Sequence, residues 1–280
     1  MTSSSRASAW VESPLQLICA VEYGASAGIP LRVIPRAGSA QLESTSARLR
    51  DLGLPIGVEI ASPRTLPPTG AAHLVVGDAF SGVVHASIAM RMPQRLTIVD
   101  DGSASLRLPS ALRSQRALSR DGAASAIAAL ASSRLRSLDD ADDLELFSYY
   151  DLDHPALVEN RFTWLTSREA VGAMSGTVVL GTASVVDELL DEGDFLRWLS
   201  TQPVGAAYLP HRREGAATLA AARDFGLEVI ETGLPVELSL LGCRDLDIRT
   251  LPSSAADTLR IVLAEGGSRI HVDSPLAVAA

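Results

Sequence analysis

The alternation of short apolar runs with helical segments is the feature that most constrains the fold of this chain. Runs typical of strands lie at residues 9–12, 31–34, 56–60, 73–78 and 95–100, and again at 177–181, 206–209, 227–230, 247–250 and 269–272. Strands that alternate with helices indicate a parallel sheet with helices on both faces. A chain of 280 residues has room for two modest domains or one large one. The pattern therefore predicts an α/β protein with two halves.

The rhythm of strands stops in the middle of the sequence. Residues 103–146 are rich in Ser, Ala and Arg and then in Asp, which favours helices, and residues 149–165 read as a segment crossing between domains. We expect a Rossmann-like N-terminal domain over residues 1–150 and a second over residues 151–280. Ligands of such sheets bind at the carboxyl ends of the strands, and pockets tend to form between domains.

Capping signals predict where several helices begin and end. Ser13 is suited to be the N-cap of a helix with Pro14 at its first position, and Gly53 is suited to end a helix over residues 39–52. The second half favours helices at 184–200, at 214–225, at 235–242 and from about 255.

Charge excludes several classes of function. All 24 basic residues are Arg, so neither a catalytic Lys nor a phosphate-binding-loop Lys is present, and the net charge is -9. An acidic chain without a basic block is a poor candidate for binding nucleic acid or for a polybasic membrane anchor. Abundant Ala, with Arg in place of Lys, suggests a bacterium of high genomic GC content.

Cysteines and apolar runs indicate the compartment. Cys19 and Cys243 stand alone in apolar stretches, so we expect them to be reduced and buried. No apolar run reaches the roughly 18 residues of a membrane span, and the polar residues 1–6 do not begin a signal peptide. We expect a cytoplasmic protein.

An acidic turn follows the run at 95–100. Asp100 and Asp101 stand at the end of this run and Gly102 comes next. The turn is compatible with a simple acidic helix cap. It is also compatible with a general base that accepts a proton from a hydroxyl group.

Polar groups that suit an anion follow three runs of the second half. His211, Arg212 and Arg213 precede a helix, where backbone N–H groups and guanidinium groups favour phosphate, although a basic surface turn explains them equally well. Ser253 and Ser254 fit either a helix cap or a phosphate contact. Gly181 and Thr182 follow the run at 177–181, and Gly there allows close backbone approach.

Other candidate motifs are weaker. Asp151 and Asp153 form an Asp-x-Asp pair, but the surrounding pattern does not fit the metal-dependent fold that uses one. The sequence lacks a Gly-x-Gly-x-x-Gly after its first strand, which argues against a dinucleotide enzyme. We expect a solvated acidic loop from four aspartates, namely Asp139, Asp140, Asp142 and Asp143. We expect core or surface roles for three histidines, namely His73, His85 and His271.

Six short motifs, in this order, resemble those of the bacterial sialyltransferases of the lipooligosaccharide sialyltransferase and polysialyltransferase type. They are Glu12-Ser13-Pro14-Leu15-Gln16-Leu17, Asp100-Asp101-Gly102-Ser103, Leu180-Gly181-Thr182, Tyr208-Leu209-Pro210-His211-Arg212-Arg213-Glu214, Pro235-Val236-Glu237 and Ser253-Ser254. The resemblance spans residues 12–260. The sequence differs from the family at Thr182, where Gln is usual. It also has His211-Arg212 where the family has a His-Pro pair. The literal His154-Pro155 lies in the expected crossing segment.

The resemblance implies a GT-B architecture, in which two Rossmann-like α/β/α domains face a cleft. It implies inverting, metal-independent transfer of sialic acid or a related nonulosonic acid from a CMP-activated donor to a glycan hydroxyl, without a cofactor. A cell-surface polysaccharide is a plausible acceptor. The acceptor side would lie in the N-terminal domain and the CMP-donor side in the C-terminal domain.

The resemblance also implies a role for each site residue. Asp101 would be the general base and His211 would assist the departing CMP phosphate. The other implied residues are donor-binding Gly181, Thr182, Arg212, Glu237, Ser253 and Ser254, and acceptor-side Gln16, Asp100 and Gly102. Two alternatives stay open: a non-catalytic nucleotide- or glycan-binding module on a transferase fold, and a GT-B transferase that uses another nucleotide sugar such as a UDP-sugar.

Overall fold

The chain forms two compact units in the computed structural model. The structure describes residues 7–114, 117–119, 125–170 and 172–274. The units are Met1–Arg168 and Glu169–Ala280. The polar segment 1–6, which is not expected to begin a signal peptide, lies outside the described residues.

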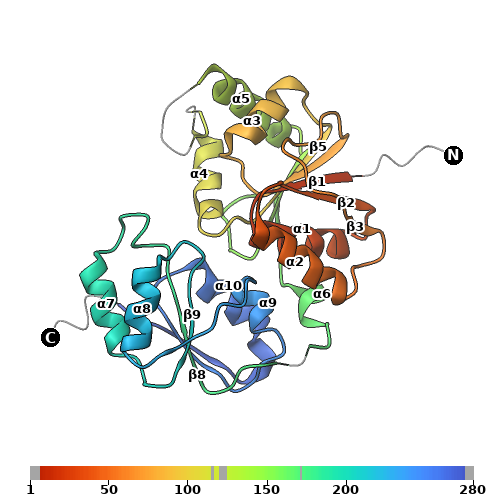
Figure 1. The fold of residues 1–280 in the computed structure, drawn as a ribbon. Coiled ribbons are helices and arrows are strands. Elements are labelled where there is room, and N and C mark those ends of the chain that lie inside the picture. The colour runs from red at the N-terminus through yellow and green to blue at the C-terminus, as the bar shows by residue number, and fades with distance from the viewer. Residues whose placement is uncertain (1–6, 115–116, 120–124, 171, 275–280) are drawn as a thin grey trace. The chain divides into compact units, whose positions relative to one another are not determined.

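The first unit is built on a parallel sheet of seven strands (Figure 1). Its strands are β1 (Ala7–Val11), β2 (Leu31–Pro35), β3 (Val58–Ile60), β4 (His73–Val76), β5 (Arg95–Val99), β6 (Leu144–Ser148) and β7 (Leu157–Glu159). The strand order is β3-β2-β1-β4-β5-β6-β7. Because the chain leaves β1 in one direction and β4 in the other, the switch point of the sheet lies between these two strands.

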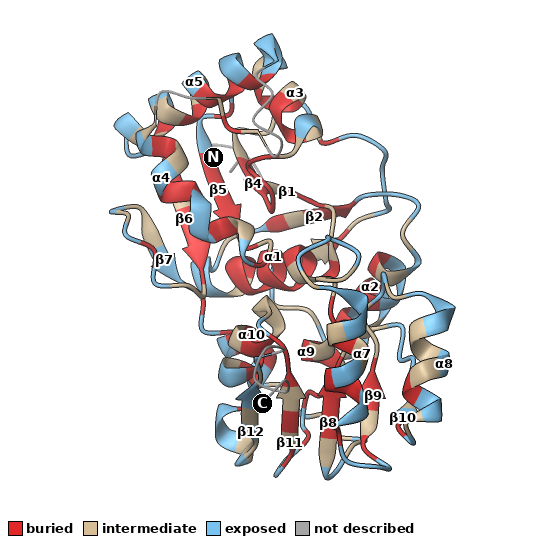
Figure 2. Cartoon of the chain, turned by 90° about the vertical axis from the view of Figure 1, so that its left-hand side faces the viewer, coloured by how far each residue is buried: buried red, intermediate tan, exposed pale blue. Residues whose placement is uncertain are grey.

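Helices cover this sheet, and the strands between them are largely buried (Figure 2). They are α1 (Pro14–Ala27), α2 (Ala40–Asp51), α3 (Gly82–Met90), η1 (Ala104–Arg107), α4 (Leu108–Arg113), α5 (Ala126–Asp140) and α6 (Thr163–Thr166). Helix α1 packs against α2 and α6, whereas α3 packs against α5. The core beneath α3, α4 and α5 is aliphatic, with Trp10 as its largest fully buried side chain.

The expected caps of the first helices are confirmed. Ser13 is the N-cap of α1, where its hydroxyl accepts a hydrogen bond from the Gln16 N–H, and Pro14 takes the first position. Gly53 follows α2 with a φ of 78°, a left-handed conformation that glycine adopts without strain.

The expected crossing segment and domain boundary are wrong. Strand β6 pairs with β5, and β7 pairs with β6, so residues 149–165 belong to the first sheet and its connections. The boundary lies after Arg168 rather than after residue 150. The sequence obscured these strands because β6 follows a run of aspartates, and β7 has only three residues, two of them exposed.

The second unit repeats the architecture on a smaller scale. Its strands are β8 (Thr177–Leu180), β9 (Ala207–Leu209), β10 (Glu228–Val229), β11 (Asp247–Thr250) and β12 (Arg269–Val272), in the order β10-β9-β8-β11-β12. Its helices are α7 (Glu192–Ser200), α8 (Ala216–Asp224), α9 (Val236–Ser239), α10 (Ser254–Val262) and η2 (Ala264–Gly266). All pairings are parallel, and the switch point lies between β8 and β11.

The fold class is α/β, as the sequence predicted, and each sheet has the order of a Rossmann-like unit. One helix differs: α7 begins at Glu192, not near 184, because Asp191 is its N-cap and Glu188 has a positive φ. Within the described residues, no helix combines the length and the apolar character needed to cross a membrane.

Candidate functional site

Gln16 occupies the switch point of the first sheet. Its side chain is buried, and its Oε1 accepts a hydrogen bond of 2.7 Å from the Glu12 N–H. Gly77 follows β4, and a Cβ atom there would lie 2.1 Å from the Gln16 side chain. Glycine therefore leaves the space that Gln16 fills. The sequence-predicted residue Gln16 stands at the carboxyl edge of the sheet, held by the backbone that begins α1.

Asp100 is a buried carboxylate that joins two strand ends. It follows β5, and its oxygens accept 2.7 Å hydrogen bonds from the Ser148 hydroxyl and from the Tyr149 N–H. Burial raises the pKa of Asp100 to about 6, because the desolvation of the charged form outweighs the stabilising hydrogen bonds. Nearby Asp101 raises this pKa further. Asp100 thus anchors the segment after β6 to the end of β5.

Asp101 lies at the same edge and is partly exposed. The Ser13 hydroxyl donates a hydrogen bond of 3.1 Å to its Oδ1, so the N-cap of α1 contacts the acidic turn. Gly102 has a φ of 64°, which explains a glycine after the two aspartates. The structure therefore brings Gln16, Asp100, Asp101 and Gly102 to the carboxyl ends of β1, β4 and β5.

Gly181 in the second unit packs against protein atoms. A Cβ atom at Gly181 would lie 2.4 Å from Glu214 Oε1 and 2.5 Å from the His211 backbone nitrogen. Thr182 is buried, and its N–H donates a hydrogen bond of 2.7 Å to Glu214 Oε1. The space expected at Gly181 for a ligand is thus filled by the segment that follows β9.

Glu214 is the residue at this edge to which the sequence interpretation gave no role. Its Oε2 accepts a hydrogen bond of 2.6 Å from the Tyr208 hydroxyl, and its N–H donates to the His211 carbonyl. Burial raises the pKa of Glu214. Tyr208 and Glu214 flank His211 within one motif of the resemblance. The presence of Glu214 in that motif was the sequence signal that its side chain fixes the His211 turn against β8.

His211 is half-buried at the carboxyl end of β9. Its Nδ1 accepts a hydrogen bond of 3.3 Å from the Arg213 N–H. Burial lowers its pKa to about 4, and the charges of Arg212 and Arg213 add to this effect. Arg212 is exposed, whereas Arg213 forms an ion pair with Asp187. His211 is therefore neutral at pH 7 and adjoins cationic groups.

The N-terminus of α10 follows β11, on the other side of β8 from His211. Ser253 is its N-cap residue, yet its side chain makes no capping hydrogen bond. The Ser253 hydroxyl lies 3.4 Å from that of Thr250, and Ser254 begins the helix. The first N–H groups of α10 are thus not capped by a side chain, which is the arrangement that binds anions at helix ends.

Glu237 lies in α9, which packs against α10. Its side chain is buried, and Oε1 accepts a hydrogen bond of 2.6 Å from the Thr258 hydroxyl. Burial raises its pKa. This contact joins α9 to α10 and orients the helix whose N-terminus carries the two serines.

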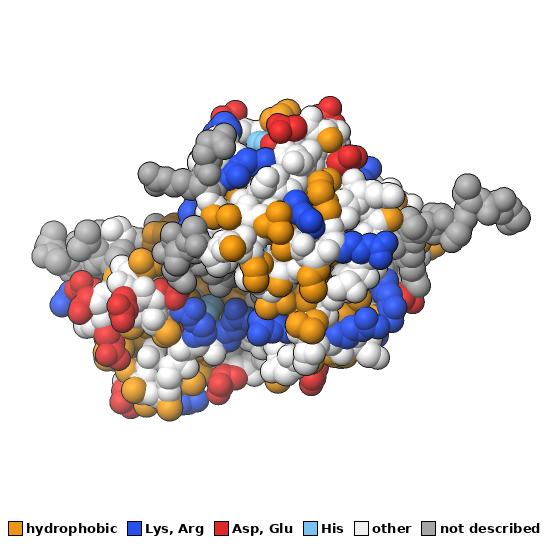
Figure 3. All heavy atoms as spheres, turned by 90° about the horizontal axis from the view of Figure 1, so that it is seen from above, with side chains coloured by type: hydrophobic (Ala, Val, Ile, Leu, Met, Phe, Trp, Pro, Cys, Tyr) orange, Lys and Arg blue, Asp and Glu red, His pale blue; other side chains and the backbone are white. Residues whose placement is uncertain are grey.

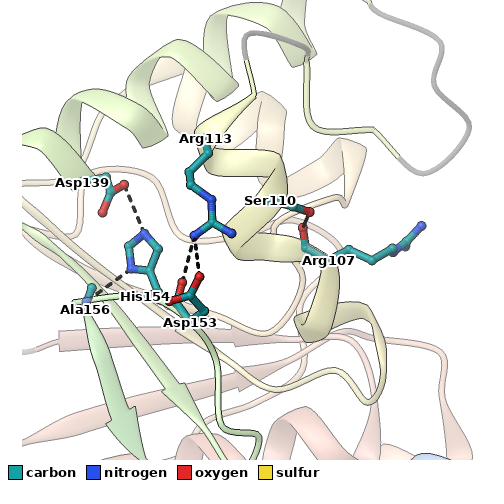
Figure 4. A network of polar contacts seen from close by, with 7 residues as sticks. All are labelled: Arg107, Ser110, Arg113, Asp139, Asp153, His154 and Ala156. Atoms are coloured by element: carbon teal, nitrogen blue, oxygen red, sulfur yellow. Dashed lines mark hydrogen bonds and ion pairs between the residues drawn. The ribbon is translucent and has the colours of Figure 1, made fainter.

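The His154-Pro155 pair has a structural role in the first unit (Figure 4). His154 Nε2 lies 3.3 Å from Asp139 Oδ2, and Nδ1 accepts a hydrogen bond from the Ala156 N–H. Arg113 contacts the neighbouring Asp153. The pair therefore fastens the turn before β7 to α5. The expected acidic loop is wrong at Asp139 and Asp140, which form the last residues of α5.

The remaining sequence candidates also have protein partners. His85 is buried against the Ala79 carbonyl, His73 contacts Thr97, and His271 pairs with Asp247. Burial lowers the pKa of His73 to about 4. Both cysteines are buried and neither is in a disulfide, as predicted. Among the described residues, no group of three or more His, Cys, Asp or Glu is arranged to hold a metal ion.

Comparison with known proteins adds no assignment. No protein-family model matches the chain, and no match was found among curated proteins. The case for a function therefore depends on two edges: the switch-point edge of the first unit (Ser13, Gln16, Asp100, Asp101, Gly102) and the switch-point edge of the second unit (Gly181, Thr182, His211, Ser253, Ser254).

Proposed function

We propose that this chain is an inverting, metal-independent glycosyltransferase of GT-B architecture. It transfers sialic acid or a related nonulosonic acid from a CMP-activated donor to a hydroxyl group of a glycan. The observation that carries the proposal is the chemical difference between the edges of two Rossmann-like units, one carboxylate-rich and the other suited to an anion. Group transfer from a nucleotide needs both kinds of group.

The second unit is the donor-binding part in this proposal. Neighbouring parallel strands lie about 4.8 Å apart, so the ends of β9 and β11 are separated by roughly 10 Å across β8. A phosphate bound between the ends of β9 and β11 would therefore lie near both His211 and the N-terminus of α10. Ser253, Ser254 and the α10 N–H groups bind the phosphate, and Arg212 supplies positive charge.

The first unit supplies the base. Asp101 accepts the proton of the acceptor hydroxyl while the oxygen forms a bond to the anomeric carbon of the donor sugar. The bond from that carbon to the CMP phosphate breaks, and the phosphate keeps the electron pair. Ser13 holds one oxygen of Asp101, and buried Asp100 fixes the turn from which Asp101 projects.

His211 stabilises the departing phosphate. In the free protein it is neutral, because burial and two arginines lower its pKa to about 4. A phosphate beside the ring raises this pKa, since a negative charge favours the imidazolium. The leaving group thus creates the condition under which His211 donates a charge-assisted hydrogen bond.

The proposal is tested by thermal unfolding in the presence of CMP, CDP, UMP, UDP or GDP. Each nucleotide is measured with and without EDTA. A ligand that binds only the folded chain stabilises it by about 2.7 kcal/mol at a hundredfold excess over its dissociation constant. We expect the cytidine nucleotides alone to raise the unfolding temperature, and we expect EDTA to leave this increase unchanged. Selectivity for UDP, or a shift that EDTA removes, would contradict the assigned donor. CMP binding without transfer or donor hydrolysis would instead indicate a binding module.

A further inference from the structure

The outward faces of α3 and of the first half of α5 lack charge. Residues 82–90 and 125–133 contain no charged side chain, and the two helices pack against each other. Met90, Met92, Ile127 and Leu130 are 38–69% exposed on or directly after these helices. A helix at a water-exposed surface ordinarily places polar and charged residues on its outer side. An apolar outer face marks a surface that meets something other than water.

These exposed side chains lie on two helices that pack side by side. Ile127, Leu130 and Arg134 are neighbours on α5, three and four residues apart. The Arg134 guanidinium donates a hydrogen bond of 2.7 Å to the Ile88 carbonyl, which places the C-terminal turn of α3 beside α5. Met90, Arg91 and Met92 follow. We call these six exposed or rim residues the α3–α5 patch, namely Met90, Arg91, Met92, Ile127, Leu130 and Arg134.

The patch lies in a stretch of the sequence where arginines outnumber acidic residues. Between Asp78 and Asp139 the sequence has eight arginines and three aspartates, a net charge of +5, whereas the rest of the chain carries -14. Figure 3 looks onto the end of the first unit where α3 and α5 lie, and shows hydrophobic side chains gathered there with arginines among and around them. Acidic side chains return along α5 only at Asp139, about 14 Å from Leu130 at 1.5 Å per residue.

From this combination we propose that the α3–α5 patch docks the protein on an anionic membrane surface. Met90, Met92, Ile127 and Leu130 enter the boundary between headgroups and acyl chains. Arg91 contacts lipid phosphates, because a guanidinium beside an apolar stem reaches the headgroups while the stem stays in the apolar layer. Docking of this kind is peripheral and needs no membrane-spanning helix.

Charge favours the membrane over a second copy of this chain. A symmetric dimer interface would bring this patch against its own copy, with Arg91 and Arg134 on both partners and no acidic residue in the patch to pair with them. Like charges facing each other disfavour that contact. An anionic bilayer satisfies both the apolar side chains and the arginines. The proposal is independent of the function proposed above.

Vesicle flotation of the full chain tests the docking. We expect binding to vesicles of equal parts phosphatidylglycerol and phosphatidylcholine at least tenfold stronger than to phosphatidylcholine alone, with loss in 0.5 M salt. The triple variant M90S/I127S/L130S should bind at least tenfold more weakly. Arg91→Ser should weaken binding about fivefold. Because these side chains are exposed, circular dichroism and thermal unfolding should match the unsubstituted protein.

Matched controls stand in the second unit. Leu189→Ser and Val204→Ser remove side chains that are more exposed than those of the patch, and Arg223→Ser removes an exposed arginine. These variants should bind vesicles as the unsubstituted chain does. Absence of vesicle binding, or equal binding by the triple variant, would overturn the proposal. So would self-association in sedimentation that only the triple variant loses, which would make a second copy the occupant.

Discussion

The two units share a strand order at their switch points but differ in what the carboxyl edge carries. In the first unit the edge carries two aspartates and the hydroxyl of Ser13. In the second it carries a histidine, an exposed arginine and a helix N-terminus without a side-chain cap. The comparison teaches that the shared scaffold fixes where polar groups stand, while the residues after each strand decide which charge they present.

Both edges also use one carboxylate to hold their geometry, a buried one in the first unit and a half-buried one in the second. Asp100 accepts hydrogen bonds from Ser148 and Tyr149 in the first unit, and Glu214 accepts from Thr182 and Tyr208 in the second. Each carboxylate is assigned a positioning role, because its oxygens are occupied by protein donors. The proposed function assigns the ligand contacts to Asp101 in one unit, and to His211 with the α10 N-terminus in the other.

The largest effect that would sharpen this division is expected for Asp101→Asn. Asparagine keeps an oxygen for the Ser13 hydroxyl but cannot accept the proton of the acceptor. We expect transfer from CMP-sialic acid to fall by about 10²–10⁴-fold while the CMP-induced thermal shift stays unchanged. Steady-state kinetics with a glycan acceptor measures this. Asp151→Asn, an exposed carboxylate in the first unit, is the control and should leave transfer intact. Full activity in D101N would remove Asp101 as the base.

Gly181→Ala should break the edge of the second unit. The added methyl group would meet Glu214 and the His211 backbone at 2.4–2.5 Å. Overpacking of this kind costs about 1–3 kcal/mol. Hydrogen exchange followed by mass spectrometry should show faster exchange in β8 and β9, with the first unit unchanged. Gly215→Ala is the matched control, because nothing lies within 4 Å of a Cβ atom there. Equal behaviour of the two variants would contradict the packing role of Gly181.

The sequence predicted the strands that carry the edges because those strands are apolar runs bounded by polar turns. It failed at β6 and β7, where an aspartate run precedes one strand and the other is short and mostly exposed. A periodic hydrophobic pattern indicates which residues are buried, and a half-exposed edge strand has few buried residues to produce such a pattern. The boundary at residue 150 followed from that omission.

The sequence predicted the positions of the candidate residues better than it predicted their contacts. Asp100 and Asp101 are adjacent and chemically identical, yet one is buried between two donors and the other is partly exposed. Gly181 suggested space for a ligand, but Glu214, thirty-three residues later, fills it. Contacts between residues distant in sequence arise from the sheet order, which spacing along one chain does not contain.

Asp100→Asn should change how stability depends on pH. The folded pKa of Asp100 is about 6, above its ordinary value of 3.8, so the folded chain binds more protons between these values than the unfolded chain. Its contribution to stability is therefore lost as pH rises from about 4 to about 6. We expect the stability of D100N relative to the unsubstituted chain to rise by about 2 kcal/mol over that window. Urea unfolding at pH 4, 5, 6 and 7 measures it, with Asp153→Asn as an exposed control. A constant difference would show that Asp100 is ionised normally.

The smallest expected effect concerns His211 and distinguishes a phosphate-binding edge from a basic turn. At pH 7 the neutral ring contributes one hydrogen bond to CMP, so His211→Ala should weaken binding about fivefold. Because phosphate raises the pKa of His211 above its free value of about 4, binding takes up a proton as pH falls. The affinity ratio of the unsubstituted chain to H211A should thus grow from pH 7 to pH 5. Calorimetric titration measures this ratio, in which protonation of CMP itself cancels. His271→Ala, an exposed histidine paired with Asp247, should show a ratio near one throughout. A ratio for His211 that does not change with pH would place the phosphate away from the ring and leave the α10 N-terminus as the anion site of the second unit.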